Sequence, residues 1–187
     1  VIYGVPPYAY LWSDGSTTED NDSLMAGIYL VTVTDALGTS VTDSIRIYDT
    51  WQDHRDMQQY MVVKIASDLW MAENMNYTTS SGSWYYNNDS LSYAGLYGRL
   101  YTWNIAGEVC PVGWHLPGDQ EWKNLEMWLG MSNIEADSSQ YFRGTGEGGA
   151  LKEAGKLHWN IPNTGAVNET GLSALPAGWY DSAATSF

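Results

Sequence analysis

The side chains in this sequence that most often carry catalysis or bind metals are three histidines and one cysteine. His54, His115 and His158 show no H-x-x-x-H spacing, and Cys110 has no second cysteine with which to form a zinc site or an intrachain disulfide. No serine lies in a nucleophile-elbow pattern. The sequence therefore predicts no catalytic residue, and we expect a protein that is not an enzyme. For His115 we favour a hydrogen-bonded structural role, and for Cys110 a buried, unreactive one.

Acidic residues dominate the charge, with 22 Asp and Glu against 8 Lys and Arg and a formal net charge of −14. Proteins bind nucleic acid largely through Lys and Arg contacts to phosphates, so nucleic acid is not an expected partner. No apolar run approaches the roughly 18 residues that a membrane-spanning helix needs. We therefore expect no membrane-spanning segment.

Aromatic residues are skewed towards those with a polar atom, with 10 Trp and 14 Tyr but only 2 Phe. Such rings suit half-wet surfaces on which a sugar or a protein partner can stack. They occur in the polar segment 77–93 and again near residue 179. The alternative is that these rings pack within and between loops. The predicted ligand-binding residues are Trp84, Tyr85, Tyr86, Trp179 and Tyr180.

A turn followed by a helix is expected to be the framework that positions these loops. The prolines and glycines of CPVGWHLPG predict a rigid turn at residues 110–118. Apolar residues three and four apart predict a helix over 119–128, with Gly118 or Asp119 as its N-cap and Gly130 at its C-terminal end. The tryptophans that we assign to the core are Trp70, Trp103, Trp114, Trp122 and Trp128.

The chain divides by pattern into two parts. Residues 1–49 alternate as β-strands do and include a predicted hairpin over 27–48, but so few strands expose too much apolar surface to be a finished domain. Residues 50–59 are polar and lack periodicity, so we interpret them as a linker. Residues 60–187 combine a strand at 60–65 with short helices and long loops, of which 77–93 is one.

The first part resembles a known repeat. The segments PPYAYLWSDG and LMAGIYLVTVTDALGTSVTDSIRI are similar to those of the immunoglobulin-like repeats of bacterial gliding adhesins, the SprB type. The resemblance implies that residues 1–49 are part of an all-β immunoglobulin-like sandwich. It also implies neighbouring repeats in a longer chain.

The second part resembles another family. DLWMAENMNY, YGRLYTW, CPVGWHLPGDQEW and GLSALPAG occur in the order typical of the Fibrobacter succinogenes major paralogous domain, found in secreted and surface proteins of Bacteroidetes and Fibrobacteres. The resemblance implies an α+β, C-type-lectin-like domain of the formylglycine-generating-enzyme type over residues 60–187, lacking its last strands. That enzyme activity depends on a pair of cysteines, and this chain has only Cys110.

A C-type-lectin-like fold raises the question of calcium. The sequence WNIPN at 159–163 is loosely similar to lectin calcium signatures but lacks their carboxylate. The simpler interpretation is a segment without metal. The weak candidate ligands for calcium are Asn160, Asn163, Asn168 and Glu169.

These features together predict a non-catalytic segment of a large secreted protein at the bacterial outer cell surface. Its expected role is binding or adhesion to an extracellular glycan or a surface protein. The alternative is a purely structural stalk, spacer or filament-building unit with no ligand of its own. A long polar loop rich in Tyr and Trp favours the first.

Overall fold

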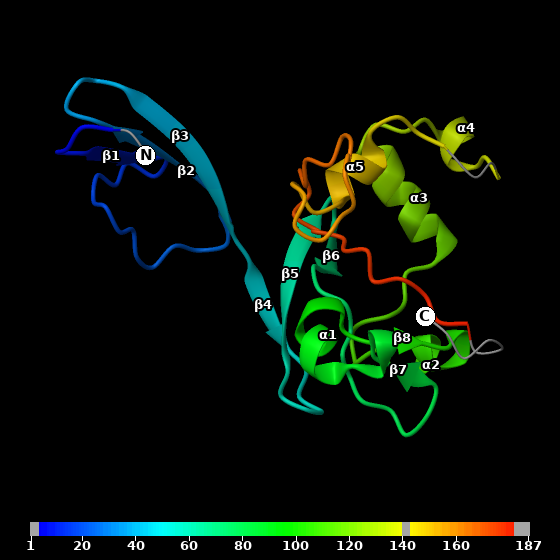
Figure 1. The fold of residues 1–187 in the computed structure, drawn as a ribbon. Helices are drawn as coiled ribbons and strands as arrows, with labels where there is room; N and C mark the ends of the chain where they lie inside the picture. Colours follow the sequence, from blue (N-terminus) through cyan, green and yellow to red (C-terminus); the bar gives the residue numbers. More distant parts are fainter. Residues whose placement is uncertain (1–3, 140–142, 182–187) are drawn as a thin grey trace. The chain divides into compact units, whose positions relative to one another are not determined.

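The computed structural model describes residues 4–139 and 143–181, and its contacts divide the chain into two compact units. The first unit is Val1–Asp49 and the second is Thr50–Phe187. Their elements are labelled in Figure 1. In the described part of the chain, no helix combines the length and the apolar character needed to cross a membrane.

The first unit is a three-stranded antiparallel sheet with the order β1-β2-β3. The strands are β1 (Ala9–Trp12), β2 (Gly27–Thr34) and β3 (Ser40–Ile47). The predicted hairpin over 27–48 is confirmed. Its register pairs Val33 with Val41, so the apolar residues of both strands share a face, as the alternation predicts.

Asp35 fixes the turn between β2 and β3. Its Oδ1 accepts hydrogen bonds from the backbone N–H groups of Leu37 and Thr39, at 2.9 and 2.8 Å. Residues 4–49 contain this one antiparallel layer, and they show no second layer of the partial immunoglobulin-like sandwich that the resemblance implies. Three strands supply a single layer, and side chains such as Val41 and Ile45 consequently remain about half exposed.

The second unit mixes short helices with small antiparallel sheets, which confirms a mixed α+β architecture. One sheet has the order β4-β5-β6, and β7 pairs with β8 (Figure 1). The strands are β4 (Asp49–Gln52), β5 (Gln59–Ile65), β6 (Asp68–Met71), β7 (Ser83–Trp84) and β8 (Leu100–Tyr101). The helices are η1 (Tyr86–Asn88), α1 (Ser90–Tyr97), α2 (Trp103–Glu108), α3 (Asp119–Trp128), α4 (Asn133–Ala136) and α5 (Glu147–Leu151).

The core of this unit lies between β5, β6 and α3. Val63 and Ile65 of β5, Trp70 of β6 and Leu125 of α3 form one buried cluster. Removing such side chains from water is the main favourable term in folding. The ring of Trp122 packs on that of Trp70, with centroids 4.9 Å apart.

The predicted turn into a helix is confirmed. α3 begins after Gly118, ends at Trp128 and is followed by Gly130 with φ of +115°, a conformation that glycine adopts readily. The Glu121 carboxylate accepts hydrogen bonds from Gly118 N, at 2.7 Å, and from His115 Nε2, at 2.5 Å. These contacts lower the pKa of Glu121, the backbone N–H of Gly118 being the largest cause.

The core assignment of the tryptophans is correct for Trp70 and wrong for two others. Trp103 is 81% exposed and Trp128 is 55% exposed. Each lies at an end of its helix, Trp103 at the start of α2 and Trp128 at the end of α3, beyond the turns that face the sheet. Trp122 is partly exposed, and Trp114 is half-buried against Trp51 at 5.4 Å between centroids.

Residues 50–59, which we interpreted as a linker from their polarity, are ordered within the second unit. They contain most of β4, the start of β5 and a turn in which Asp53 N–H donates to the Gln58 carbonyl at 2.8 Å. Asp53 is 1% exposed and forms an ion pair with Arg55, with Oδ2 and Nη2 2.6 Å apart. Arg55 Nη1 donates to the Val109 carbonyl at 2.8 Å. This buried pair holds a polar segment in place.

Candidate binding site

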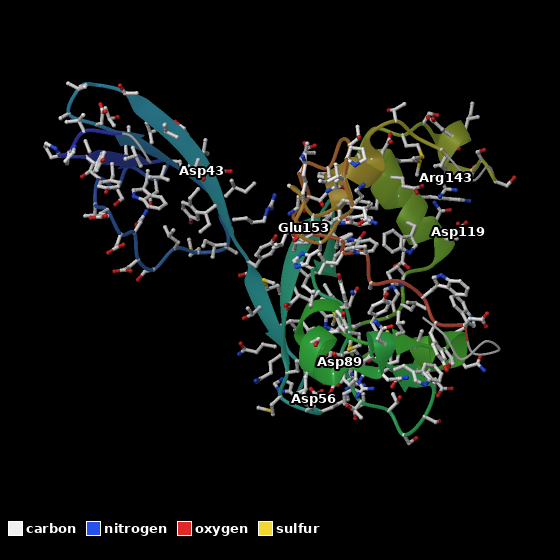
Figure 2. The ribbon with its side chains drawn as sticks, in the orientation of Figure 1. Asp43, Asp56, Asp89, Asp119, Arg143 and Glu153 are labelled. Atoms are coloured by element: carbon white, nitrogen blue, oxygen red, sulfur yellow. The ribbon has the colours of Figure 1, made fainter. Side chains whose placement is uncertain are left out.

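The polar segment 77–93, expected to be a loop, is more structured than its composition indicates. It contains β7 and η1, and its end enters α1. Asp89 is the N-cap of α1, and its Oδ1 accepts a hydrogen bond from Ser92 N at 3.1 Å (Figure 2). The helix therefore places Tyr93 and Tyr97, four residues apart, on the same face.

Three tyrosines of this region form one wall of a cavity. Tyr93 and Tyr97 are stacked with centroids 5.8 Å apart, and Tyr86 meets them edge-on at 5.2 and 6.2 Å. The cavity has a volume of about 620 Å³. We call it the aromatic pocket, and it is lined by Tyr86, Tyr93, Tyr97, Lys152, His158, Trp159, Asn160, Pro162, Asn163, Thr164, Pro176 and Gly178.

The opposite wall is held through Ala174. A parallel β-bridge joins Lys152 to Ala174, and the indole N–H of Trp159 donates to the Ala174 carbonyl at 3.0 Å. The Nζ of Lys152 lies 4.6 Å from the ring centroid of Trp159, within the range of a cation–π contact. One backbone position thus holds both the main chain of Lys152 and the ring of Trp159.

The loop between Lys152 and Asn163 is closed by side chains. Asn163 Nδ2 donates to the carbonyls of Glu153 and Gly155 at 3.1 and 2.7 Å, and Asn163 itself has φ of +41°. Glu153, labelled in Figure 2, lies 2.7 Å through Oε1 from His158 Nδ1. The pair is about four-fifths buried, so His158 presents a fixed ring to the pocket.

Two acceptor atoms of this loop are buried without a donor among the described residues. They are Glu153 Oε2 and Asn163 Oδ1. Buried polar atoms are usually satisfied by protein or by ordered water. Because both atoms are buried, they lie behind the pocket surface rather than on it.

A second, larger cavity of about 980 Å³ lies against the core and the turn that precedes α3. Its lining includes Leu69, Trp70, Met71, Trp114 and Trp122, which makes it more apolar in side-chain chemistry than the aromatic pocket. His158 lines both cavities.

The predicted ligand-binding residues have different surroundings. Tyr86 lines the aromatic pocket, whereas Trp84 packs on Tyr180 at 4.5 Å between centroids. The Arg99 guanidinium covers the Tyr85 ring at 3.9 Å. Trp179 is 70% exposed and does not line the pocket. The segment near residue 180 therefore does approach the segment 77–93, as the Trp84–Tyr180 contact shows.

The sequence-based candidates omit several residues of the pocket. The sequence does contain a signal for Tyr93 and Tyr97. Asp89 is a typical helix N-cap residue, and a helix that begins there places the two tyrosines on one face. The sequence contains no such signal for Lys152 or His158. The position of Lys152 depends on its bridge to the distant Ala174, and that of His158 on its hydrogen bond to Glu153.

Two of the candidate calcium ligands serve to close loops. Besides Asn163, Asn168 donates through Nδ2 to Ser173 Oγ at 2.7 Å and accepts through Oδ1 from Ser173 N at 2.9 Å. Asn160 lines the aromatic pocket, and Glu169 is exposed. Across residues 4–139 and 143–181, no three His, Cys, Asp or Glu side chains are grouped so as to hold a metal ion.

Cys110 is half-buried, and its Sγ lies 3.6 Å from the Ala106 carbonyl, to which the thiol donates. Burial raises the pKa of this thiol, which disfavours the nucleophilic thiolate. His54 is exposed and lines neither cavity. The residue types first considered for catalysis are thus spread over different parts of the unit.

Comparison with known proteins places the second unit in a family. The profile of the Fibrobacter succinogenes major domain matches residues 63–187, well over half of the chain. No curated protein matches the sequence, and no solved structure does. The matched region contains α3, its preceding turn and every residue that lines the aromatic pocket. The chain therefore belongs to the Fibrobacter succinogenes major domain family.

Proposed function

We propose that this chain is a non-catalytic binding segment of a secreted bacterial cell-surface protein, and that its ligand is a glycan seated in the aromatic pocket. The observation that carries the proposal is the arrangement of Tyr86, Tyr93, Tyr97 and Trp159 around one cavity. Sugars offer apolar C–H faces to rings and hydroxyls to polar groups. The pocket has both kinds of partner, since Asn160 and Thr164 also line it.

The size and rigidity of the pocket support this proposal. Its volume of about 620 Å³ lies within the ~300–1,000 Å³ of pockets that bind small ligands. The tyrosines contact one another, and Trp159 is held by its bond to the Ala174 carbonyl. Preformed side chains lose little conformational entropy when a ligand binds.

The finer fold and location form part of the same proposal. We assign the second unit to the C-type-lectin-like type found in formylglycine-generating enzymes, supported by its small antiparallel sheets and by the turn that leads into α3. We assign the first unit to an SprB-type immunoglobulin-like repeat, supported by its sequence segments and its three-stranded sheet. Neighbouring repeats and an extracellular, outer-surface location follow from these assignments.

A second candidate function is a structural stalk or spacer. It is favoured by the engagement of aromatic rings in internal packing, as in the Trp84–Tyr180 contact and the cover of Tyr85 by Arg99. A stalk needs such packing for rigidity and needs no ligand. The two candidates differ in what the aromatic pocket does.

A glycan array followed by calorimetry on the intact protein tests the proposal. We expect at least one glycan to be retained, and we expect Trp159→Ala and Tyr93→Ala each to weaken its binding by about tenfold, the equivalent of ~1.4 kcal/mol. Trp128→Ala is the matched control, because that ring is exposed and lies outside the pocket. Retention of no glycan, or equal binding by folded pocket variants, would favour the stalk.

A further inference from the structure

The charged groups of the aromatic pocket differ in sign from the protein as a whole. The chain has a formal net charge of −14, with acids outnumbering bases by 22 to 8. The described residues that line the pocket nevertheless include no Asp or Glu, and they include the ammonium of Lys152. An anionic ligand in this pocket would therefore meet no carboxylate in the lining, although the protein as a whole is acidic.

Lys152 is the central group of this pattern. Its side chain is partly buried, its Nζ lies over the Trp159 ring at 4.6 Å, and it makes no ion pair within the described parts of the chain. The adjacent carboxylate, Glu153, is hydrogen-bonded to His158 instead. A partly buried ammonium without a carboxylate partner is unfavourable, and a bound anion would compensate it.

The backbone of Lys152 is held at Ala174. The two residues form a parallel bridge, and the Glu153 N–H donates to the Ala174 carbonyl at 3.2 Å. The Trp159 indole donates to the same carbonyl, and the Lys152 ammonium lies over that ring in the 4.6 Å cation–π contact. An anionic group that enters beside the ring would therefore meet a preorganised charge.

We propose that the aromatic pocket selects a sugar that carries a carboxylate, of the uronic acid type, and that Lys152 is its anion contact. The inference rests on the proposed function, which places a glycan in this pocket, and adds the chemical class of that glycan. Tyr86, Tyr93 and Tyr97 contact the sugar ring, and the hydroxyl of Thr164 and the amide of Asn160 contact its hydroxyls.

The overall negative charge does not oppose this selection at close range. At physiological ionic strength, interactions between exposed charges are largely screened beyond about 8 Å. A contact between a carboxylate and Lys152 is much shorter. The nearest acid, Glu153, has its carboxylate hydrogen-bonded to His158. Repulsion from the more distant acids lowers the rate of encounter more than it lowers the stability of the bound state.

The test compares each acid with its own neutral form. The probes are the trimers of galacturonic, glucuronic and mannuronic acid, each as the free acid and as the full methyl ester, which removes the charge and keeps the sugar ring. We expect at least one acid to bind the intact protein about tenfold more tightly than its ester by calorimetry. Lys152→Gln should reduce this preference to nearly one.

Two further variants keep the result interpretable. Lys156→Gln makes the same charge change four residues away at an exposed position outside the pocket, so it should keep the preference for the acid. Lys152→Met retains a long apolar stem over Trp159, so it separates loss of charge from loss of packing. A melting curve for each variant checks that it folds.

Each outcome has a distinct meaning. Equal binding of acid and ester, or a preference that survives Lys152→Gln, would overturn the inference. Binding of neutral glycans alone would also overturn it but would leave the proposed function in place. Retention of no glycan of any kind would overturn both.

Discussion

The second unit contains two histidine–glutamate pairs with similar geometry and different surroundings. His115 Nε2 lies 2.5 Å from Glu121 Oε1 in the turn that begins α3, and both side chains are well exposed. His158 Nδ1 lies 2.7 Å from Glu153 Oε1, and this pair is mostly buried in the wall of the two cavities. The same pair of residue types thus supports a helix start in one place and shapes a cavity in the other.

The contrast extends to the regions around the pairs. The turn at 110–118 and α3 form a framework that packs on β6 and contributes Leu125 to the core. The segments 86–97 and 152–164, together with Pro176 and Gly178, supply the residues that line the pocket. We therefore expect substitutions in the framework to lower the stability of the unit, and substitutions in the pocket to lower binding.

The largest effect is expected at Leu125. Replacing this 3%-exposed side chain by alanine should lower the free energy of unfolding by about 2–5 kcal/mol, because it removes buried apolar surface and leaves a cavity. Urea unfolding would measure the change. Trp128→Ala, on the exposed side of the same helix, should change it by no more than about 0.5 kcal/mol. A similar loss in both variants would contradict the placement of the core.

The next largest effect is expected at Asp53. Asp53→Asn should lower the free energy of unfolding by about 1–2 kcal/mol near neutral pH, since it removes the charge partner of Arg55, whose own side chain is 31% exposed. Asp56→Asn is a suitable control, because Asp56 is exposed and belongs to the same turn. Unchanged stability of the Asp53 variant would show that this turn is not held by the ion pair.

Asp53 should also make the free energy of unfolding depend on pH. The hydrogen bonds from the Arg55 side chain, the largest cause, hold the pKa of Asp53 below its usual range. A carboxyl whose pKa is lower in the folded state stabilises the fold above its unfolded pKa, about 4, and that contribution is lost as the pH falls further. Unfolding measured between neutral pH and about pH 3 should therefore show a decline that is shallower in Asp53→Asn.

Local signals explain which parts of this fold the sequence predicts. The β2–β3 hairpin and α3 are predicted because alternation, three-and-four spacing and the glycines at 118 and 130 lie within the elements they define. α1 is missed because its sequence, SLSYAGLY, has no amphipathic pattern, and only the cap at Asp89 marks its start.

Long-range contacts explain what the sequence does not predict. The conformation of residues 50–59 depends on Arg55, whose guanidinium contacts the Val109 carbonyl and the Tyr77 ring. The pocket depends on Ala174, which positions both Lys152 and Trp159 from more than ten residues away. Neither contact has a periodicity or a spacing that composition and pattern could reveal. The aromatic composition therefore does not indicate which rings line the pocket.

The smallest expected effects come from the two histidine–glutamate pairs, and they test the comparison most directly. His115→Gln should lower the free energy of unfolding by about 0.5–1 kcal/mol, because the glutamine amide can still donate to Glu121 but loses more side-chain freedom than the imidazole in doing so. Binding to any glycan that the intact protein retains should stay unchanged. His158→Gln should instead weaken that binding by about two- to tenfold, the size expected for one hydrogen bond, and it should lower the free energy of unfolding by about 1 kcal/mol, because the Glu153–His158 pair is mostly buried.

Both variants remove one imidazole from a glutamate and insert the same side chain, so each serves as the control for the other. Calorimetry and urea unfolding on the two proteins give four values, and the comparison requires that only His158→Gln weakens binding. If His158→Gln lowered stability as much as His115→Gln did and left binding intact, the Glu153–His158 pair would be a loop-closing contact like that of Asn163, and the aromatic pocket would rely on its rings and on Lys152 alone.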